Sequence, residues 1–277
     1  MVASAKIIIP STAAENTSAA YISTPAEQAF ARLKATGKLS NWFHARHGLD
    51  GDGWTCHVSG LQAALAPAVG SAVLQTAPDV FSSGGPGSKS IPYGKGKASF
   101  PAGIMLTPSG TDVISWAAPF TVCTVSKNGT SSTSGLWGIV GNNGGGLSIR
   151  QRSADLIMAD TYDGTSHTAR WGSGQACDDA VWHNIEIVWT GNASAGVLSL
   201  YIDGASIFNS SSFTPPTQQT TRLALFGAFD LTDDLQHEGR NTSIAHLAVC
   251  PVSFITDTAT RDAWRAMVLD QAGTLPA

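Results

Sequence analysis

The stretch VWHNIEIVWTGNASAGVLSLYIDGASI, residues 181–207, decides the fold of this chain. In WHNIEIVWT, apolar residues such as Ile185 and Ile187 recur at every second position, which is typical of a β-strand. The segment VLSLYI alternates in the same way, and the loop GNASAG joins the two. Asp203 and Gly204 then favour a tight turn, because glycine tolerates positive φ and aspartate bonds nearby backbone. The stretch therefore predicts a hairpin, a turn and a third short strand.

The composition favours an all-β domain with an uncharged polar surface. Of the 277 residues, 43% are hydrophobic and only 13% are charged, about half the usual charged share. The 29 glycines are spread along the chain, as many short turns require. The net charge is −4 and no run of five basic residues occurs, so a nucleic-acid partner is not expected.

The chain shows no segment typical of export or of membrane insertion. The apolar run Ile7–Ile9 is cut by Pro10 and is too short for a secretory signal. No apolar run approaches the roughly 18 residues that a membrane helix requires. We therefore expect synthesis in a cytoplasm, which keeps thiols reduced. The cysteines are widely spaced and are expected to be free thiols: Cys56, Cys123, Cys177 and Cys250.

Helix signals stand before and after a long run of strand signals. Thr24 suits an N-cap, Pro25 the first helical position and Glu27 a capping box, and Gly37 ends this short helix. Ten or more short strand segments with frequent turns follow, a pattern that predicts an antiparallel sandwich. We expect the N-terminal arm and helix to be a docking element, with the sandwich as the main domain. The expected boundaries are residues 1–36 and 37–277.

A second helix is predicted near the C terminus. Trp264, Met267 and Val268 stand at positions i, i+3 and i+4, which begins an amphipathic stripe. Gln271 at i+7 is polar, so the stripe is expected to last about two turns.

The opening stretch also carries a family resemblance. Its pattern WHNIEIVW…GVLSLYIDG resembles the signature of laminin-G-like domains in the concanavalin A-like jelly-roll superfamily, and the resemblance covers residues 40–277. It implies an all-β, concanavalin A-like antiparallel β-sandwich (jelly roll) with a short N-terminal helix and a C-terminal helix. Because this fold hosts lectins, glycosidases and structural modules, the resemblance specifies function only weakly.

The segment Trp42–Ala45 is similar to the opening of jelly rolls in bacteriophage virion proteins. This resemblance implies a non-enzymatic virion structural protein whose lectin-like domain is a tail-fibre, receptor-binding module for host surface glycan. A capsid or tail decoration protein and a bacterial carbohydrate-binding module are the alternatives. The expected partners are other virion proteins, reached through residues 1–36, and host surface polysaccharide. The expected assembly is a homotrimer.

The carboxylates do not form the constellation of the glycosidases in this superfamily. The glycosidases of the superfamily that this chain resembles carry paired carboxylates in a Glu-x-Asp-x-x-Glu pattern on one strand. Retaining chemistry needs two carboxyl groups about 5 Å apart. The four glutamates, at positions 15, 27, 186 and 238, lie in no such pattern. Glu186 is expected to be a solvent-facing strand residue. We therefore expect no enzymatic activity.

Aromatic residues near turns are the candidates for glycan binding, because a ring offers a sugar an apolar face beside polar groups. Trp171, which precedes a Gly/Ser loop in TARWGSG, is the main candidate. The residues expected to bind ligand are Trp171, Tyr162, Trp137 and Trp54. For each ring, burial beneath a loop is the alternative.

One acidic loop resembles a calcium site. Laminin-G-like and legume-lectin relatives hold Ca²⁺ in loops at one rim of the sandwich, and carboxylate oxygens in flexible loops suit this ion. The segment FDLTDDLQHEGR offers Asp230, Asp233, Asp234 and Glu238. Acidic residues also favour turns in general, and this second interpretation is preferred.

A histidine-rich segment invites comparison with zinc sites. His44, His47, Cys56 and His57 offer four nitrogen or sulfur ligands. Their spacing matches no common structural zinc site. We therefore interpret these histidines as surface or loop residues.

Overall fold

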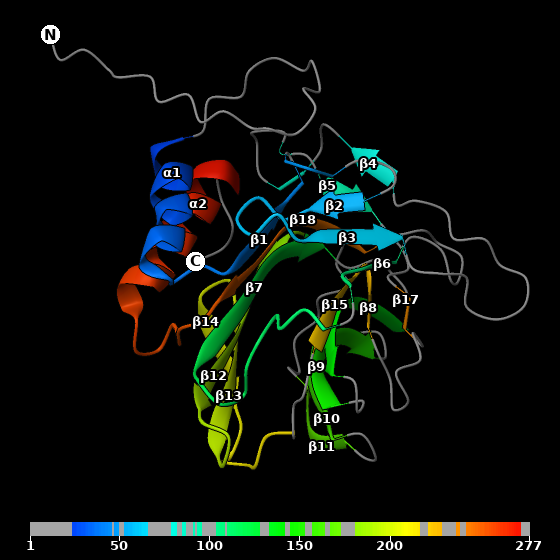
Figure 1. The fold of residues 1–277 in the computed structure, drawn as a ribbon, viewed down its shortest axis with the longest axis vertical. Coiled ribbons are helices and arrows are strands. Elements are labelled where there is room, and N and C mark those ends of the chain that lie inside the picture. The colour runs from blue at the N-terminus through cyan, green and yellow to red at the C-terminus, as the bar shows by residue number, and fades with distance from the viewer. Residues whose placement is uncertain are drawn as a thin grey trace, which may run out of the picture.

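The computed structural model is a sandwich of two antiparallel β-sheets, with two helices side by side on one flank (Figure 1). None of the described helices is long and apolar enough to span a membrane. The structure describes residues 24–45, 47–49, 53–65, 79–81, 85–86, 91, 93–95, 104–108, 110–127, 133–141, 145–152, 157–163, 167–172, 181–216, 221–228, 237–238 and 242–272.

Among these residues, the first sheet, called sheet A, has eight strands. Its order is β14-β13-β12-β7-β18-β5-β4, and β1 pairs with β18 beside this path. The strands of sheet A are β1 (Asn41–His44), β4 (Asp79–Phe81), β5 (Tyr93–Lys95), β7 (Phe120–Lys127), β12 (His183–Gly191), β13 (Gly196–Ile202), β14 (Ala205–Asn209) and β18 (Ser243–Cys250).

The second sheet, called sheet B, also has eight described strands, in the order β11-β10-β9-β8-β15-β6-β3-β2. They are β2 (Gly53–Thr55), β3 (Gln62–Leu65), β6 (Met105–Leu106), β8 (Thr133–Gly141), β9 (Gly145–Arg152), β10 (Ile157–Asp163), β11 (His167–Gly172) and β15 (Thr221–Leu225). A further short pair joins β16 (Gly227–Ala228) to β17 (His237–Glu238). This arrangement confirms the predicted all-β sandwich.

The hairpin predicted from residues 181–207 forms as β12 and β13. Asp203 and Gly204 both have positive φ, 51° and 85°, so the turn adopts the conformation that this dipeptide favours. The Asp203 carboxylate lies 2.7 Å from Nδ1 of His183 and accepts a 2.8 Å bond from the backbone N–H of Asn184. The histidine that starts β12 is thereby tied to the aspartate of the turn that follows β13.

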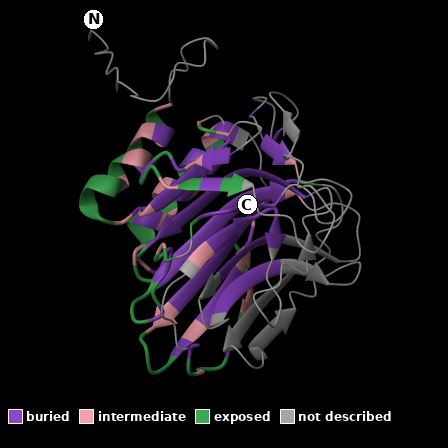
Figure 2. Ribbon diagram, turned by 45° about the vertical axis from the view of Figure 1, so that its right-hand side comes forward, coloured by how far each residue is buried: buried purple, intermediate pink, exposed green. Residues whose placement is uncertain are grey.

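The inner side of the hairpin forms part of the sandwich core. Trp189 packs edge-on against Trp116 at 5.0 Å between ring centroids, and its indole Nε1 donates to the Trp116 carbonyl at 3.2 Å. Gly191 and Gly196 lie beneath the same ring, and a Cβ on either would stand 2.5 Å from it. The two glycines of the joining loop therefore make room for the tryptophan. Figure 2 shows that the central strands of sheet A, β7, β12 and β18, are buried along most of their length.

Helix α2 (Thr258–Ala272) covers the outer side of the same hairpin. Trp264 donates from Nε1 to the Asn184 side chain at 2.9 Å. Trp264, Met267 and Val268 are buried, as the predicted stripe requires. Gln271 is also buried, so the prediction that the stripe stops after two turns was wrong: the polar side chain continues the buried face.

Glu186 is fully buried beneath α2, and the expectation that it faces solvent was wrong. Its two carboxylate oxygens accept from the Nε and Nη2 of Arg265 at 2.8 and 2.6 Å. The period of a strand identifies which residues share a side, but it does not reveal that a helix 79 residues later covers that side.

Helix α1 (Pro25–Arg32) and the following 3₁₀ turn η1 (Leu33–Thr36) pack onto the sandwich. Thr24 is the N-cap, since its hydroxyl accepts from the Glu27 N–H at 3.2 Å, and Gly37 ends the turn with a φ of 70°. Phe30 is fully buried, with its ring 5.1 Å from Trp42 and 5.2 Å from Trp264. The helix is therefore part of the core. Of the predicted docking element, residues 1–36, the first 23 residues lie outside the described part of the chain, and its docking role stays a prediction.

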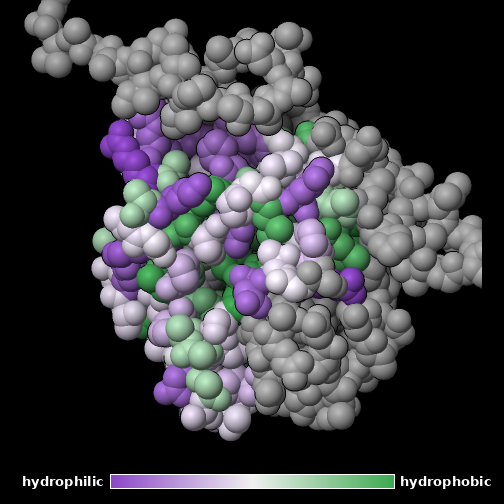
Figure 3. All heavy atoms as spheres, viewed as in Figure 1, coloured by the Kyte–Doolittle hydropathy of each residue, from purple (hydrophilic) through white to green (hydrophobic). Residues whose placement is uncertain are grey.

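Figure 3 shows one face of the molecule coloured by hydropathy. Over the described part of this face, hydrophobic residues form small patches that polar residues interrupt. Three free cysteines among the described residues, Cys56, Cys123 and Cys250, are buried, as expected for reduced thiols. Burial, with a hydrogen bond to Cys250, raises the pKa of Cys123, so this thiol stays protonated.

Candidate functional site

Two of the predicted glycan-binding residues lie on one hairpin at the edge of sheet B. Trp171 is on β11, the outermost described strand, where it pairs with Ala159. Tyr162 is on β10, where it pairs with His167. The register shifts between Thr161 and Tyr162, and irregularities of this kind are common at sheet edges and beside binding sites. The topology thus brings both aromatic residues to a single edge hairpin.

The other two predicted aromatic residues are in the core, and assigning them to ligand binding was wrong. Trp54 is fully buried on β2, where its ring stacks on Phe226 at 5.8 Å and its Nε1 donates to the His44 carbonyl at 3.3 Å. Trp137 is fully buried on β8 and pairs with Ile149. The glycines beside both tryptophans indicated turns, although both lie within strands.

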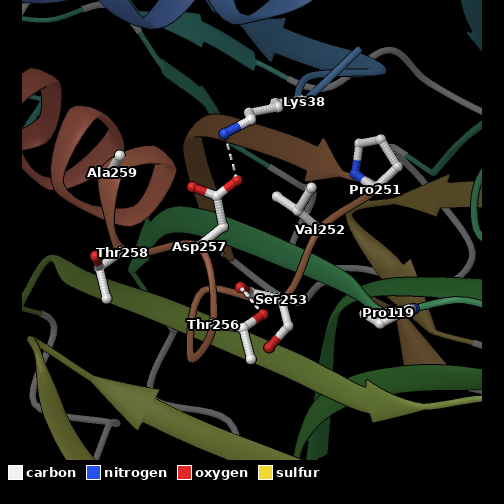
Figure 4. A pocket seen from close by; sticks show the side chains of 9 residues that line it. All are labelled: Lys38, Pro119, Pro251, Val252, Ser253, Thr256, Asp257, Thr258 and Ala259. Carbon is white, nitrogen blue, oxygen red and sulfur yellow. Dashed lines mark hydrogen bonds and ion pairs between the residues drawn. The ribbon is translucent and has the colours of Figure 1, made fainter. Parts of the chain in front are cut away.

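A hollow of about 610 Å³ lies where β18 leads into α2 (Figure 4). The Lys38 ammonium lies 2.6 Å from the carboxylate of Asp257 across it. Asp257 also caps α2, because its Oδ1 accepts from the Thr260 N–H at 3.1 Å. The bond from Lys38, followed by those from Thr260, holds the pKa of Asp257 below its usual value. These contacts fix the start of α2, so we assign the hollow a structural role.

A group of titratable side chains gathers where α1 meets β1. Oε1 of Glu27 lies 3.4 Å from Nε2 of His44 and 3.5 Å from Nε2 of His47. His44 is fully buried at the end of β1, beside His246 on β18, with ring centroids 4.2 Å apart. The expectation that these are surface or loop histidines was therefore wrong for His44.

The other two residues of the histidine-rich segment, Cys56 and His57, lie around this group. The ring of His57 stacks on His47 at 4.6 Å. Partial burial of the ring, and secondly the nearby His47, lower the pKa of His57, which favours its neutral form. The Cys56 sulfur instead accepts from the Trp42 N–H at 3.1 Å, so it is engaged elsewhere. Sequence reasoning missed Glu27, whose capping motif gave no sign that its carboxylate faces two histidines.

The predicted calcium loop falls mostly outside the described residues. Asp230, Asp233 and Asp234 are not described, and Glu238 is described as part of β17, where it pairs with Gly227. Calcium binding by this loop stays a prediction.

The fold is similar to several solved structures, whereas no protein-family model and no curated protein matches the chain. One is of botulinum neurotoxin type C, whose cell entry depends on interaction with two ganglioside molecules: TM-score 0.54, 13% identity, 83% of this chain and 51% of that chain. Another is the Trypanosoma rangeli sialidase in complex with sialic acid, with a TM-score of 0.51 and 14% identity. The match covers 86% of this chain and 34% of that chain. A third is the mouse laminin α1 chain, domains LG4-5, with a TM-score of 0.43 and 12% identity. The match covers 68% of this chain and 48% of that chain.

This chain spans about a third to a half of the length of these three solved chains. At identities of 13–14%, the likeness shows the fold alone. That fold is an all-β sandwich of two antiparallel sheets.

Proposed function

We propose that this chain is a non-enzymatic glycan-binding module, and that the β10–β11 hairpin at the edge of sheet B is its recognition surface. The observation that carries the proposal is the position of Trp171 on the outermost described strand, with Tyr162 on the strand beside it. Edge strands have one side that does not pair within the sheet, which leaves room for a ligand. Sugars bind through apolar ring faces combined with a few polar groups.

The composition and the solved neighbours support a glycan in particular. Only 13% of the residues are charged, so a ligand held mainly through hydroxyl groups suits this chain better than one held mainly through its charge. Of the similar structures, the botulinum neurotoxin type C one concerns gangliosides and the Trypanosoma rangeli one contains sialic acid. Gangliosides carry glycan headgroups, and sialic acid is a sugar.

We further propose that the module belongs to a bacteriophage virion and recognises host surface glycan as a tail-fibre component. This part rests on the resemblance of Trp42–Ala45 to virion jelly rolls. In the structure, Trp42–His44 belong to β1, which pairs with β18, and Ala45 begins the turn that follows. Residues 1–23 are the proposed attachment to other virion proteins. A particle reconstruction tests this directly, because density for the sandwich at a capsid or tail decoration site would contradict the tail-fibre role.

A glycan array probed with the labelled chain tests the binding function. We expect a restricted set of glycans to bind, with the signal lost in Trp171→Ala and reduced in Tyr162→Ala. The matched control is Leu269→Ala, which truncates a 49% exposed apolar residue on α2 and should leave the signal unchanged. Circular dichroism of all variants establishes that they are folded. An array that stays silent for the folded wild-type chain would favour a structural jelly roll.

A further inference from the structure

We propose that Glu27, His44 and His47 form a binding site for Zn²⁺ between α1 and sheet A. The separations of 3.4 and 3.5 Å between the carboxylate Oε1 and the two Nε2 atoms exceed the usual N–H···O range of about 2.7–3.2 Å. They match the edge of a tetrahedron whose ligands lie about 2.0–2.1 Å from Zn²⁺, which is about 3.4 Å. All three ligand atoms lie within 4.8 Å of one another.

Local backbone structure explains why the two histidines face the same point. The His47 N–H donates to the His44 carbonyl at 2.8 Å, and the two residues form an isolated bridge at the end of β1. This tight turn returns the chain so that both rings lie near each other, with centroids 5.0 Å apart. Glu27 reaches them from the first turn of α1, which the Thr24 cap fixes.

The chemical types of the three ligands favour Zn²⁺ over Ca²⁺ and Mg²⁺. Two imidazole nitrogens and one carboxylate form a common protein set for Zn²⁺, and the set leaves a fourth position for water. Ca²⁺ and Mg²⁺ prefer six or more oxygen ligands, which these three residues do not supply. The ring of His246, which packs edge-on against His44, helps hold that ligand in its orientation.

The burial pattern gives the ion a way in. Glu27 and His44 are buried, whereas the His47 side chain is 31% exposed and stands at the solvent side. His57, which stacks on His47, is exposed. An ion therefore enters past His47, and once bound it links the N-terminal helix to β1. Zn²⁺ would then stabilise the attachment of α1 to the sandwich.

Zinc binding to the chelator-treated chain tests the proposal, with calorimetry for affinity and thermal unfolding for stability. We expect one Zn²⁺ per chain, a raised melting temperature, and the visible spectrum of four-coordinate Co²⁺ when Co²⁺ is the probe. His47→Ala changes a partly exposed residue and should fold, yet it should weaken Zn²⁺ binding by more than about 100-fold. Glu27→Gln, which keeps the side-chain size, should do the same.

The control is His183→Ala, which removes a histidine that also faces a carboxylate, that of Asp203, away from this group. It should leave Zn²⁺ affinity unchanged. Absence of Zn²⁺ binding by the wild-type chain would overturn the proposal, as would Ca²⁺ or Mg²⁺ binding as tightly as Zn²⁺. Unchanged affinity in both His47→Ala and Glu27→Gln would place the ion elsewhere and also overturn it.

Discussion

Arg265 on α2 holds the carboxylate of Glu186 on β12 with two parallel hydrogen bonds of 2.8 and 2.6 Å. The carboxylate is fully buried, and the guanidinium is the cation that compensates its charge. Asn184 adds a third bond, from Nδ2 to Oε1 at 2.8 Å. The Glu186 carboxylate on the outer side of the hairpin is thus buried and fully paired, which fixes how α2 lies on sheet A.

We expect Arg265→Met to destabilise the fold by about 3 kcal/mol, because it leaves a buried carboxylate without its cation. Arg261→Met, on the same helix, removes an exposed pair with Asp262 and should cost less than about 0.5 kcal/mol. Urea denaturation measures both. The double variant Glu186→Leu/Arg265→Met should recover much of the loss. Equal effects of the two single arginine variants would contradict this account.

The contact between Asp257 and Lys38 predicts a pH dependence. The folded-state pKa of Asp257 is lowered, first by the bond from Lys38 and then by those from Thr260. Its contribution to stability is therefore fully present above the unfolded-state pKa of about 3.9 and is lost as pH falls through the lower folded value. The stability difference between wild type and Asp257→Asn should be constant from pH 7 to about pH 5 and shrink below about pH 4. Denaturation curves that differ equally at every pH would rule this out.

Because Phe30 is buried in the core, we expect α1 to contribute to the stability of the fold. Its ring fills a fully buried position between Trp42 and Trp264, so Phe30→Ala should destabilise the fold by about 3–5 kcal/mol. Ala29→Ser changes an exposed neighbour on the same helix and is the control. Accordingly, deletion of residues 1–36, which removes α1, should lower the melting temperature strongly. A chain without residues 1–36 that melts like the full chain would show that α1 is dispensable.

Substitutions of Asp203 test how much the turn after β13 contributes to stability. Asp203→Ala removes the contacts to His183 and to the Asn184 N–H and places alanine at a φ of 51°, at an expected cost of about 1–3 kcal/mol. Asn tolerates this φ and keeps an oxygen for the Asn184 N–H, so Asp203→Asn should cost about half as much or less. Thermal unfolding measures both. Similar losses in the two variants would mean that the carboxylate charge, rather than the turn geometry, matters most.

Local sequence patterns predicted those strands, turns and helix caps whose conformation depends on residues nearby in the sequence. The alternation in β12 and β13, the Asp203-Gly204 turn and the Thr24 cap all depend on neighbours within a few positions. The burial of Glu186 depends instead on α2, and no local pattern reveals a partner 79 residues away. Without that partner, an isolated glutamate on a strand is indistinguishable from a surface residue.

The candidate sites were harder to predict for the same reason. Trp54 and Trp137 stand beside glycines, which indicated turns, but both lie within strands of sheet B and are fully buried. The group of Glu27, His44 and His47 depends on how α1 packs against β1. His44 and His47 are close in the sequence and were noticed there, whereas Glu27 is 17 positions from His44, and only the folded chain joins them.

Glycan binding by the β10–β11 hairpin is tested most directly by calorimetric titration of the chain with the strongest glycan from the array. We predict saturable binding with Kd in the micromolar to millimolar range, weakened at least about tenfold, or by about 1.4 kcal/mol, in Trp171→Ala and unchanged in Leu269→Ala. Equal affinity of the wild-type and Trp171→Ala chains for that glycan would contradict the claim.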